Sequence, residues 1–369
     1  MSLRRVWVQC AKELVQFRRD RLTVALAFAL PLGMLLIFGF AIRLQLHDVP
    51  VAIQDFDRTP LSRAFADRIA ATQELRPSPA APERAPLEVL GRTGARAVIV
   101  IPPGTQADLA VGRPVRIQVL VDGSDVVNAL FIQNAIGATV DFMQATLGAA
   151  PPTRIQAATR TWFNPGAQES LLIVPGVYAI ILSMYPAMLA AMAMVRDKER
   201  GTIVQAYASR LRAVELIGGK LLAFWFVALL EAIVIMGVGR AIWGLHVVGD
   251  PLPLLIATPI YLCDSVLFGL MVGAATTSIG SAIEGVGAVN ALFSILLSGF
   301  LYPISTMPWI LQQLSYLVPA RHYIALTRDA FVRGAGWSNV APEPLALALL
   351  GLVFFTVAWL RLRRMQFAG

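Results

Sequence analysis

The sequence predicts an α-helical polytopic membrane protein with six transmembrane helices and an α/β extracytoplasmic domain inserted between the first two. The first observation is composition: of 369 residues, 57 % are hydrophobic and 15 % are charged, and the mean hydropathy is +0.65. These values lie far on the apolar side of an ordinary soluble protein. The second is a set of long apolar runs. The third observation is a stretch between the first two apolar runs in which the sequence has the patterns of short strands and helices instead of a long apolar run.

Six apolar runs are long enough to cross about 30 Å of hydrocarbon. They occupy residues 22–42, 171–195, 221–243, 254–278, 283–304 and 344–360. The first run has the position of a signal peptide, but it is about 20 residues long and lacks a small-residue cleavage site, so we expect it to be a retained anchor. A tight turn at Gly280-Ser281 is expected to separate the fourth run from the fifth.

Basic residues at the ends of the runs predict the orientation. Fifteen Lys and Arg lie in segments 1–21, 196–220 and 361–369, whereas loop 244–253 has none and segment 305–343 has three. Because short cytoplasmic flanks carry the basic excess, both termini are expected in the cytoplasm. The twelve Arg of 43–170 do not oppose this, since long domains are translocated regardless of charge. The net charge of +8 is thereby explained without a nucleic-acid partner. The membrane itself is expected to be a bacterial inner membrane.

The stretch 43–170 is expected to be a small α/β domain in the periplasm. Predicted strands cover 49–56, 97–101 and 115–121, predicted helices cover 61–72, 106–111 and 126–147, and the Pro- and Ala-rich 76–86 is a predicted loop. The last helix is expected to pack on the sheet, and reaching toward a partner subunit is the alternative. A metal cluster is one interpretation of four aspartates, but the preference of Asp for turns and helix caps favours a structural role for Asp55, Asp57, Asp122 and Asp125.

No motif for catalysis, metal binding or nucleotide binding is found in the sequence. Gly218-Gly219-Lys220-Leu221 lacks the spacing and the Ser or Thr of a phosphate-binding loop. There is no HExxH or GxSxG, and His47, His246 and His322 are isolated from one another. Cys10 and Cys263 provide no disulfide framework. The chain is therefore expected to have no catalytic residue, no metal and no cofactor of its own.

The segment 196–220 between the second and third runs is short and strongly charged. Its stretch 195–205 is expected to leave the membrane, turn at Gly201 and continue as a short helix on the cytoplasmic surface, with Thr202 as a candidate N-cap. A solvated loop with interspersed charges is the alternative interpretation.

This segment resembles the signature of type 2 ABC exporter permeases, in which a Glu-x-Gly-Thr motif leads into a coupling helix held in a cleft of the ATPase subunit. Glu199, Gly201 and Thr202 match the motif directly, and Glu215 with Gly219-Lys220 matches the re-entry into the next span. The resemblance implies that Glu199, Gly201 and Thr202 transmit force from a separate ATPase chain, which carries the ATP and Mg²⁺. The expected coupling residues are Glu199, Gly201, Thr202, Ile203 and Gln205.

A second match lies near the C-terminus, in 298–309, 317–323 and Arg333-Gly334. In the family this region forms a re-entrant hairpin on the outer face, which implies such a hairpin at 305–343. The residues that mark it are Gly299, Pro303, Pro308, Pro319 and Arg321. The chain departs from the family at Ser209-Arg210, where relatives often have a Pro, and the local turn geometry there is correspondingly open.

The resemblance covers essentially the whole chain and is to the multidrug-export subgroup with a large periplasmic domain. It implies the permease subunit of an ATP-driven exporter that moves amphiphilic or drug-like molecules out of the cytoplasm or inner leaflet. The implied partners are the ATPase, a second copy of the permease or a homologous one, membrane lipid and, as a further candidate, a periplasmic adaptor. The basic, amphipathic segment 1–21 looks like the interfacial helix of that family, with a simple positive anchor as the alternative.

Two other functions are compatible with the spans alone. An ion-coupled transporter would ordinarily show inverted repeats or paired broken helices, and the sequence has no internal repeat. A non-transporting scaffold or receptor needs only the spans and the large domain. Polar residues within apolar runs carry a functional expectation; Glu231 and Asp264 are expected to pair with a basic group or touch substrate, whereas Glu284 and Arg240 have the alternative of lying at span ends. Asn290 is a further candidate.

Overall fold

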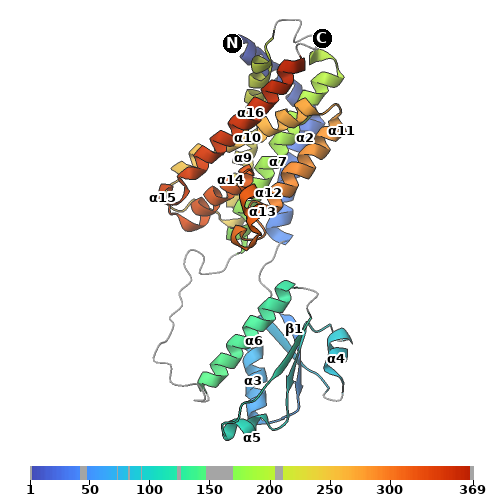
Figure 1. The fold of residues 1–369 in the computed structure, drawn as a ribbon, viewed down its shortest axis with the longest axis vertical. Coiled ribbons are helices and arrows are strands. Elements are labelled where there is room, and N and C mark those ends of the chain that lie inside the picture. Colours follow the sequence, from blue (N-terminus) through green and yellow to red (C-terminus); the bar gives the residue numbers. More distant parts are fainter. Residues whose placement is uncertain are drawn as a thin grey trace. The chain divides into compact units, whose positions relative to one another are not determined.

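A computed structural model describes residues 2–41, 48–72, 74–81, 84–92, 94–122, 126–146, 169–203 and 211–365. The chain forms two compact units (Figure 1). The helical unit consists of Met1–Ile42 and Thr161–Gly369, and the inserted unit consists of Arg43–Arg160. Each unit has its own buried apolar core.

Six helical segments of the described chain are long and apolar enough to cross a membrane, in agreement with the predicted number. Five of these segments are α2 (Arg21–Ala41), α7 (Glu169–Glu199), α9 (Ala213–Trp243), α10 (Leu252–Ala275) and α16 (Pro342–Met365). The fifth in chain order is composite: α11 (Ile279–Gly285) continues into the π-helix η1 (Val286–Ala291) and then α12 (Leu292–Leu296).

Helix α7 is buried along most of its length and lies at the centre of the helical unit. It packs closely against α10, because small residues face each other at a spacing of four. A side chain at Gly269 would overlap the carbonyl oxygen of Ala187, and one at Gly273 would lie 2.8 Å from that of Ala191. These two helices therefore approach at backbone distance.

Three predictions about where the spans begin, end or turn are wrong. Helix α9 begins at Ala213 instead of 221, so the end of the predicted loop 196–220 is helical; the Glu215 carboxylate accepts a hydrogen bond from the Arg212 backbone and caps this start. The fifth span ends at Leu296 instead of 304, before Gly299 adopts a φ of +81°. Gly280 and Ser281 do not form the turn after the fourth span. They lie in the first turn of α11, whose N-cap is Ser278.

The segment 297–341 contains η2 (Ile304–Thr306), α13 (Trp309–Ser315), α14 (Pro319–Arg328), η3 (Asp329–Arg333) and α15 (Trp337–Val340). Arg328, the last residue of α14, binds the start of this segment, since its guanidinium donates to the carbonyls of Gly299 and Phe300 at 2.9 and 3.2 Å. Tyr323 stacks on Tyr261 of α10 with ring centroids 4.1 Å apart. The predicted hairpin segment is thus a set of short helices packed on the spans.

The inserted unit has a four-stranded sheet in the order β2-β1-β3-β4, which confirms the predicted small α/β fold. Strand β1 (Val49–Asp55) pairs parallel with β2 (Leu75–Pro79) and β3 (Ala97–Ile101), and β4 (Gln118–Val121) is antiparallel to β3. Its helices are α3 (Pro60–Ala70), α4 (Pro86–Arg92), α5 (Thr105–Ala110) and α6 (Val126–Thr146). The predicted loop 76–86 is wrong, because it contains most of β2, and the third predicted strand begins at Gln118 instead of 115.

Helix α6 packs on the sheet as expected, with Ile132 and Ile136 buried in the core. The structural role predicted for the aspartates is confirmed at two positions. Asp55 accepts hydrogen bonds from the backbone of Asp57 and Arg58, and Asp57 accepts from the backbone of Gly104 at the start of α5. No cluster of His, Cys, Asp or Glu suited to a metal occurs among the described residues; Asp125 lies outside them.

Candidate functional site

The first candidate site is built where α1 (Leu3–Arg19) lies along α9. The two helices come close at Gly219, where a Cβ would lie 2.5 Å from the Cβ of Gln9 and 3.0 Å from the backbone oxygen of Val6. Only glycine permits this approach without a shift of α1. The basic, amphipathic segment predicted at 1–21 is thus a helix whose buried face, including Val6 and Cys10, packs against the helical unit.

A group of four charged residues joins α1 to α7 and α9. The ammonium of Lys220 lies 2.7 Å from Glu13 Oε1 and 2.6 Å from Asp197 Oδ2, and its side chain is 0 % exposed. Lys12 lies on the outer side, 3.4 Å from Asp197. We call Lys12, Glu13, Asp197 and Lys220 the four-charge cluster. Because two carboxylates meet two ammonium groups, burial leaves no charge uncompensated.

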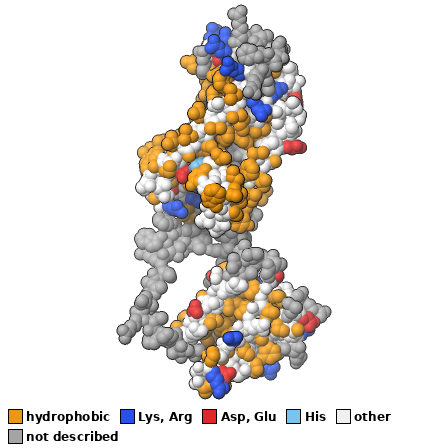
Figure 2. Space-filling view, viewed as in Figure 1, with side chains coloured by type: hydrophobic (Ala, Val, Ile, Leu, Met, Phe, Trp, Pro, Cys, Tyr) orange, Lys and Arg blue, Asp and Glu red, His pale blue; other side chains and the backbone are white. Residues whose placement is uncertain are grey.

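Further polar contacts fix the start of α2 against α7. Asp20 forms an ion pair with Arg196 at 3.0 Å, and its carboxylate accepts from both the hydroxyl and the backbone of Thr23. The Thr23 hydroxyl, with a smaller contribution from Arg196, holds the pKa of Asp20 below its ordinary value. These contacts and the four-charge cluster lie at the same end of the helical unit as the chain termini, where Figure 2 shows Lys and Arg side chains gathered.

Lys198 and Glu199 bind the ends of two different spans. The ammonium of Lys198 donates to the carbonyls of Gly273, Ala274 and Thr276 at 2.7, 2.7 and 3.0 Å, at the C-terminal end of α10. The Glu199 carboxylate accepts from the backbone nitrogen of Ile279, the first residue of α11, at 3.0 Å. A cation satisfies free carbonyls at a helix C-terminus and an anion satisfies free amides at an N-terminus, so both charges complement the helix dipoles.

The chain turns immediately after this pair. Gly201 has a φ of +68°, a conformation that favours glycine. Thr202 donates its hydroxyl back to the backbone and side-chain oxygens of Asp197, at 3.1 and 2.9 Å. Glu199, Gly201, Thr202 and Ile203 are therefore brought together next to the four-charge cluster. Gln205, and the residues that an N-cap at Thr202 would contact, lie outside the described residues.

The five hairpin residues named from the sequence all fall in or beside the 297–341 segment. The Gly299 carbonyl accepts from Arg328, Pro303 precedes η2, Pro308 precedes α13 and Pro319 opens α14. Arg321 stacks its guanidinium 3.5 Å from the centroid of the Tyr316 ring. His322, which had no predicted catalytic role, contacts Glu343 and the carbonyl of Tyr316.

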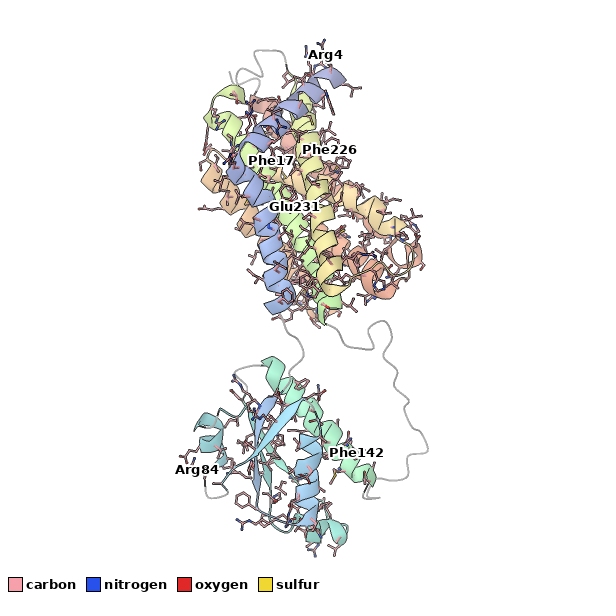
Figure 3. The ribbon with its side chains drawn as sticks, turned by 180° about the vertical axis from the view of Figure 1, so that it is seen from behind. Arg4, Phe17, Arg84, Phe142, Phe226 and Glu231 are labelled. Carbon is pink, nitrogen blue, oxygen red and sulfur yellow. The ribbon has the colours of Figure 1, made fainter. Side chains whose placement is uncertain are left out.

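The three intramembrane carboxyl residues are not brought together. Glu231, in the middle of α9 (Figure 3), is 0 % exposed and neither of its oxygens has a hydrogen-bond partner among the described residues. Asp264 on α10 is 1 % exposed and its Oδ2 likewise lacks a partner. The expected basic partner of these two residues is therefore absent from the described chain. Glu284 is exposed on α11, inside the fifth span, whereas Arg240 lies in the last turn of α9.

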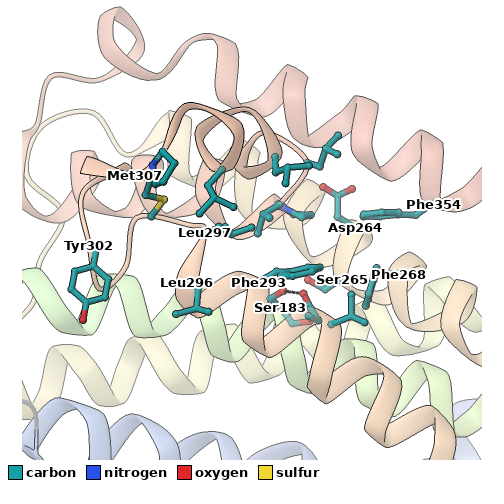
Figure 4. Close-up of a pocket in the computed structure, with 18 of the residues that line it drawn as sticks. Ser183, Asp264, Ser265, Phe268, Phe293, Leu296, Leu297, Tyr302, Met307 and Phe354 are labelled. Atoms are coloured by element: carbon teal, nitrogen blue, oxygen red, sulfur yellow. Dashed lines mark hydrogen bonds between the residues drawn. The ribbon is translucent and has the colours of Figure 1, made fainter. Parts of the chain in front are cut away.

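A cavity of about 800 Å³ lies beside Asp264 (Figure 4). Its walls come from α7, α10, the composite fifth span, the 297–341 segment and α16. On one wall, Asn290 of η1 donates to the Ser183 carbonyl at 2.7 Å and accepts from the Ser183 hydroxyl at 2.8 Å. Sequence reasoning missed this cavity and the role of Ser183. The available signal was a serine within the otherwise apolar run 171–195.

Sequence reasoning also missed Lys198, Asp197 and Lys220 as contact residues. The signal was their position: Asp197 and Lys198 directly precede the Glu-x-Gly-Thr motif, and Lys220 is a lysine at the start of an apolar run. Their partners are up to 207 positions away in the chain, so no local pattern identifies the pairs.

Residues 21–360 match the family described as ABC-2 family transporter protein. The chain is 27 % identical to the probable multidrug ABC transporter permease YbhS of Escherichia coli (strain K12), over 99 % of this chain and 98 % of the relative. It is 25 % identical to the probable multidrug ABC transporter permease YbhR of that strain, over 94 % and 96 % of the two chains. Its identity to the inner membrane transport permease YhhJ is 28 %, over 87 % and 86 %. The chain therefore belongs to the ABC-2 transporter family, as the transmembrane permease subunit of an ABC exporter.

Proposed function

We propose that this permease subunit exports amphiphilic or drug-like molecules, and that a separate ATPase chain drives it by holding the segment that begins at Glu199. The observation that carries the proposal is the pair of contacts made by Lys198 and Glu199. These two consecutive residues bind the end of α10 and the start of α11. The printed names of YbhS and YbhR, both probable multidrug permeases, support the substrate class.

These contacts provide a physical route for force. A displacement of the segment after α7 pulls on the carbonyls at the end of α10 and on the first amide of α11, because Lys198 and Glu199 bond to both. The four-charge cluster carries the same displacement to α1 and α9, since Asp197 is bound to Lys220. Charge-assisted hydrogen bonds are short and about twice as strong as neutral ones, which suits them to this role. Movement of one short segment thus reaches three spans, namely α9, α10 and the composite fifth span, and also α1.

The remaining parts of the assembly are proposed from membership of the ABC-2 family. ATP and Mg²⁺ are bound by the ATPase chain, and two permease chains, identical or homologous, form the transport path. The chain lies in a bacterial inner membrane with both termini and residues 196–220 in the cytoplasm, and with 43–170 in the periplasm, where an adaptor has access to it. The basic side chains gathered at the end with the termini support this orientation.

Replacement of Glu199 tests the proposal. Glu199→Ala removes the carboxylate that caps α11, and we expect about a fivefold to tenfold loss of export, since a helix cap is worth about 0.5–2 kcal/mol. Export is measured in cells that express the permease with its ATPase, and co-purification of the ATPase is measured in detergent. Glu284→Ala is the matched control, because it removes an exposed carboxylate from the same helix without removing a hydrogen bond that the structure describes.

Two results would contradict the proposal. One is full export by Glu199→Ala at wild-type protein levels. The other is the failure of any ATPase chain to co-purify with the wild-type permease under conditions that preserve export-competent protein. A loss of export in both variants would likewise exclude a specific role for the α11 cap.

A further inference from the structure

The cavity beside Asp264 has a lining of unusual chemistry. Its volume of about 800 Å³ lies within the range of sites that bind drug-sized molecules. Most of the lining side chains are apolar, among them Phe293, Leu311 and Val318. Asp264 is the only acidic or basic residue among those that line it. Among the described residues that line it, the cavity therefore has one acidic group and no basic group, so any formal charge on its lining is negative.

The Asp264 side chain is buried, and one of its two carboxylate oxygens has no partner among the described residues. Its residue is 1 % exposed, and Oδ2 has no hydrogen-bond partner among the described residues. Helix α16 packs on it at Gly351, where any side chain would overlap the carboxylate. The rings of Phe268 and Phe354, with centroids 5.4 Å apart, lie beside it (Figure 4). A buried carboxylate is costly unless a positive group or hydrogen-bond donors compensate it.

Three of the four hydroxyl-bearing residues that line the cavity donate to other groups and do not supply that compensation; the fourth, Tyr302, is 62 % exposed. The Ser265 hydroxyl donates to the Tyr261 carbonyl at 3.0 Å, and the Thr306 hydroxyl donates to the Pro303 carbonyl at 2.7 Å. The Ser183 hydroxyl donates to the Asn290 side chain. Each of these hydroxyls therefore presents its oxygen, not its hydrogen, to further contacts. The polar lining is rich in acceptors, and the aromatic faces are also electron-rich.

We propose that this cavity binds a lipophilic monocation, with the positive group against Asp264 and the apolar body along the hydrophobic walls. Carboxylate and aromatic rings together are the groups that stabilise an organic cation outside water. Such a ligand compensates the buried charge and fills the cavity with apolar surface at once. The proposal deepens the proposed function, on which it rests, by naming the class of molecule exported.

The test uses two ions of the same shape and opposite charge. Tetraphenylphosphonium and tetraphenylborate are measured for saturable binding to the purified full-length permease in detergent, by equilibrium dialysis against micelles that lack protein. We expect tetraphenylphosphonium to bind at least about tenfold more tightly than tetraphenylborate, since one charge interaction away from water is worth at least that factor. This comparison needs no substitution and so does not depend on the folding of a variant.

Asp264→Asn assigns the charge preference to this residue. The substitution is nearly isosteric, and we expect about a tenfold loss of affinity for tetraphenylphosphonium with little change for tetraphenylborate. Glu231→Gln is the matched control, because it neutralises an equally buried carboxylate that does not line the cavity. It should leave tetraphenylphosphonium binding unchanged.

Three outcomes would overturn the proposal: no saturable binding of tetraphenylphosphonium to the wild-type chain, equal binding of the two ions, or equal affinity in Asp264→Asn and wild type. Because binding is measured without the ATPase, its failure leaves the test of Glu199 unaffected. Conversely, Glu199→Ala could retain full export while the wild-type permease binds tetraphenylphosphonium. That pair of results would contradict the proposed coupling and leave the cation site standing.

Discussion

Among the residues that the structure describes, buried charged side chains have partners of opposite charge in one region of the helical unit and lack them in another. At the end that contains the four-charge cluster, Lys220 is enclosed by Glu13 and Asp197, and every one of these side chains has a partner of opposite charge. In the interior of the spans, Asp264 and Glu231 are equally buried, but each has at least one carboxylate oxygen without a partner. Buried Asp and Glu side chains are therefore paired with lysine in the first region and left with unpartnered oxygens in the second.

This difference in pairing indicates which region is stable without a further ligand or partner. A buried network in which each charge is paired keeps one arrangement and transmits displacement, because breaking one pair leaves the other charge stranded. A buried carboxylate without a partner destabilises the protein until something else compensates it. Helix α10 belongs to both regions: it carries Asp264 near its middle, and its last carbonyls bind Lys198. A change at one region therefore has a direct path to the other.

The largest effect is expected on removing the shared cation of the cluster. Lys220→Met leaves Glu13 and Asp197 buried without their closest counter-charge, and the free energy of unfolding should fall by about 3–5 kcal/mol. Unfolding of the purified permease is followed by thermal or denaturant titration in detergent.

Lys12→Met is the control for this variant. Lys12 is 39 % exposed and 3.4 Å from Asp197, so its loss should cost less than about 1 kcal/mol. Equal losses for Lys220→Met and Lys12→Met would show that burial does not distinguish the two lysines, and the contrast between the regions would lose its basis.

A smaller effect of opposite sign is expected at Glu231. Glu231→Met replaces an unpartnered carboxylate by an apolar side chain of similar length, and the free energy of unfolding should rise by about 1–3 kcal/mol, the cost of one unsatisfied buried group. Glu13→Met, the same substitution at a paired position, should lower it. Destabilisation by both variants would mean that Glu231 has a partner in the assembled transporter, such as a second permease chain.

The sequence was sufficient for much of the fold. Apolar length predicted six spans because a helix must satisfy its backbone in lipid, and alternation predicted β3 at its observed bounds. It failed at β2, where Pro77 and Pro79 indicated a loop. In the order β2-β1-β3-β4 this strand lies at the sheet edge, where proline removes no hydrogen bond that a further strand would need.

Less of the candidate site could be predicted. Glu199, Gly201 and Thr202 were predicted from their motif. The contacts that this segment makes with α10 and α11 were not predicted. Lys198 binds carbonyls 75 to 78 positions away, and a side chain that pairs across such a distance leaves no local periodicity. The close packing of α7 on α10 did have a signal, since Gly269 and Gly273 are four apart, as are Ala187 and Ala191.

The smallest effect is expected in the inserted unit, where Asp57 is a partly exposed counterpart to the paired carboxylates of the four-charge cluster. The Thr59 hydroxyl, followed by the backbone amides of Gln106 and Gly104, lowers the pKa of Asp57. A lowered pKa in the folded state means that the carboxylate stabilises the fold above the ordinary pKa of Asp and that this contribution is lost as pH falls through the folded-state value. Asp57→Asn should therefore cost less than about 1 kcal/mol at neutral pH and nothing in strong acid.

Hydrogen exchange of the Gly104 and Gln106 amides in the full-length chain measures this contribution, after correction for the intrinsic exchange rate at each pH. Asp67→Asn is the control, because Asp67 is exposed on α3 and makes no side-chain hydrogen bond that the structure describes. The effect of Asp67→Asn on exchange of the Gly104 and Gln106 amides should not change with pH. A pH-independent loss in Asp57→Asn would show that the side chain acts through its shape alone, and that even a satisfied carboxylate in this chain need not act through its charge.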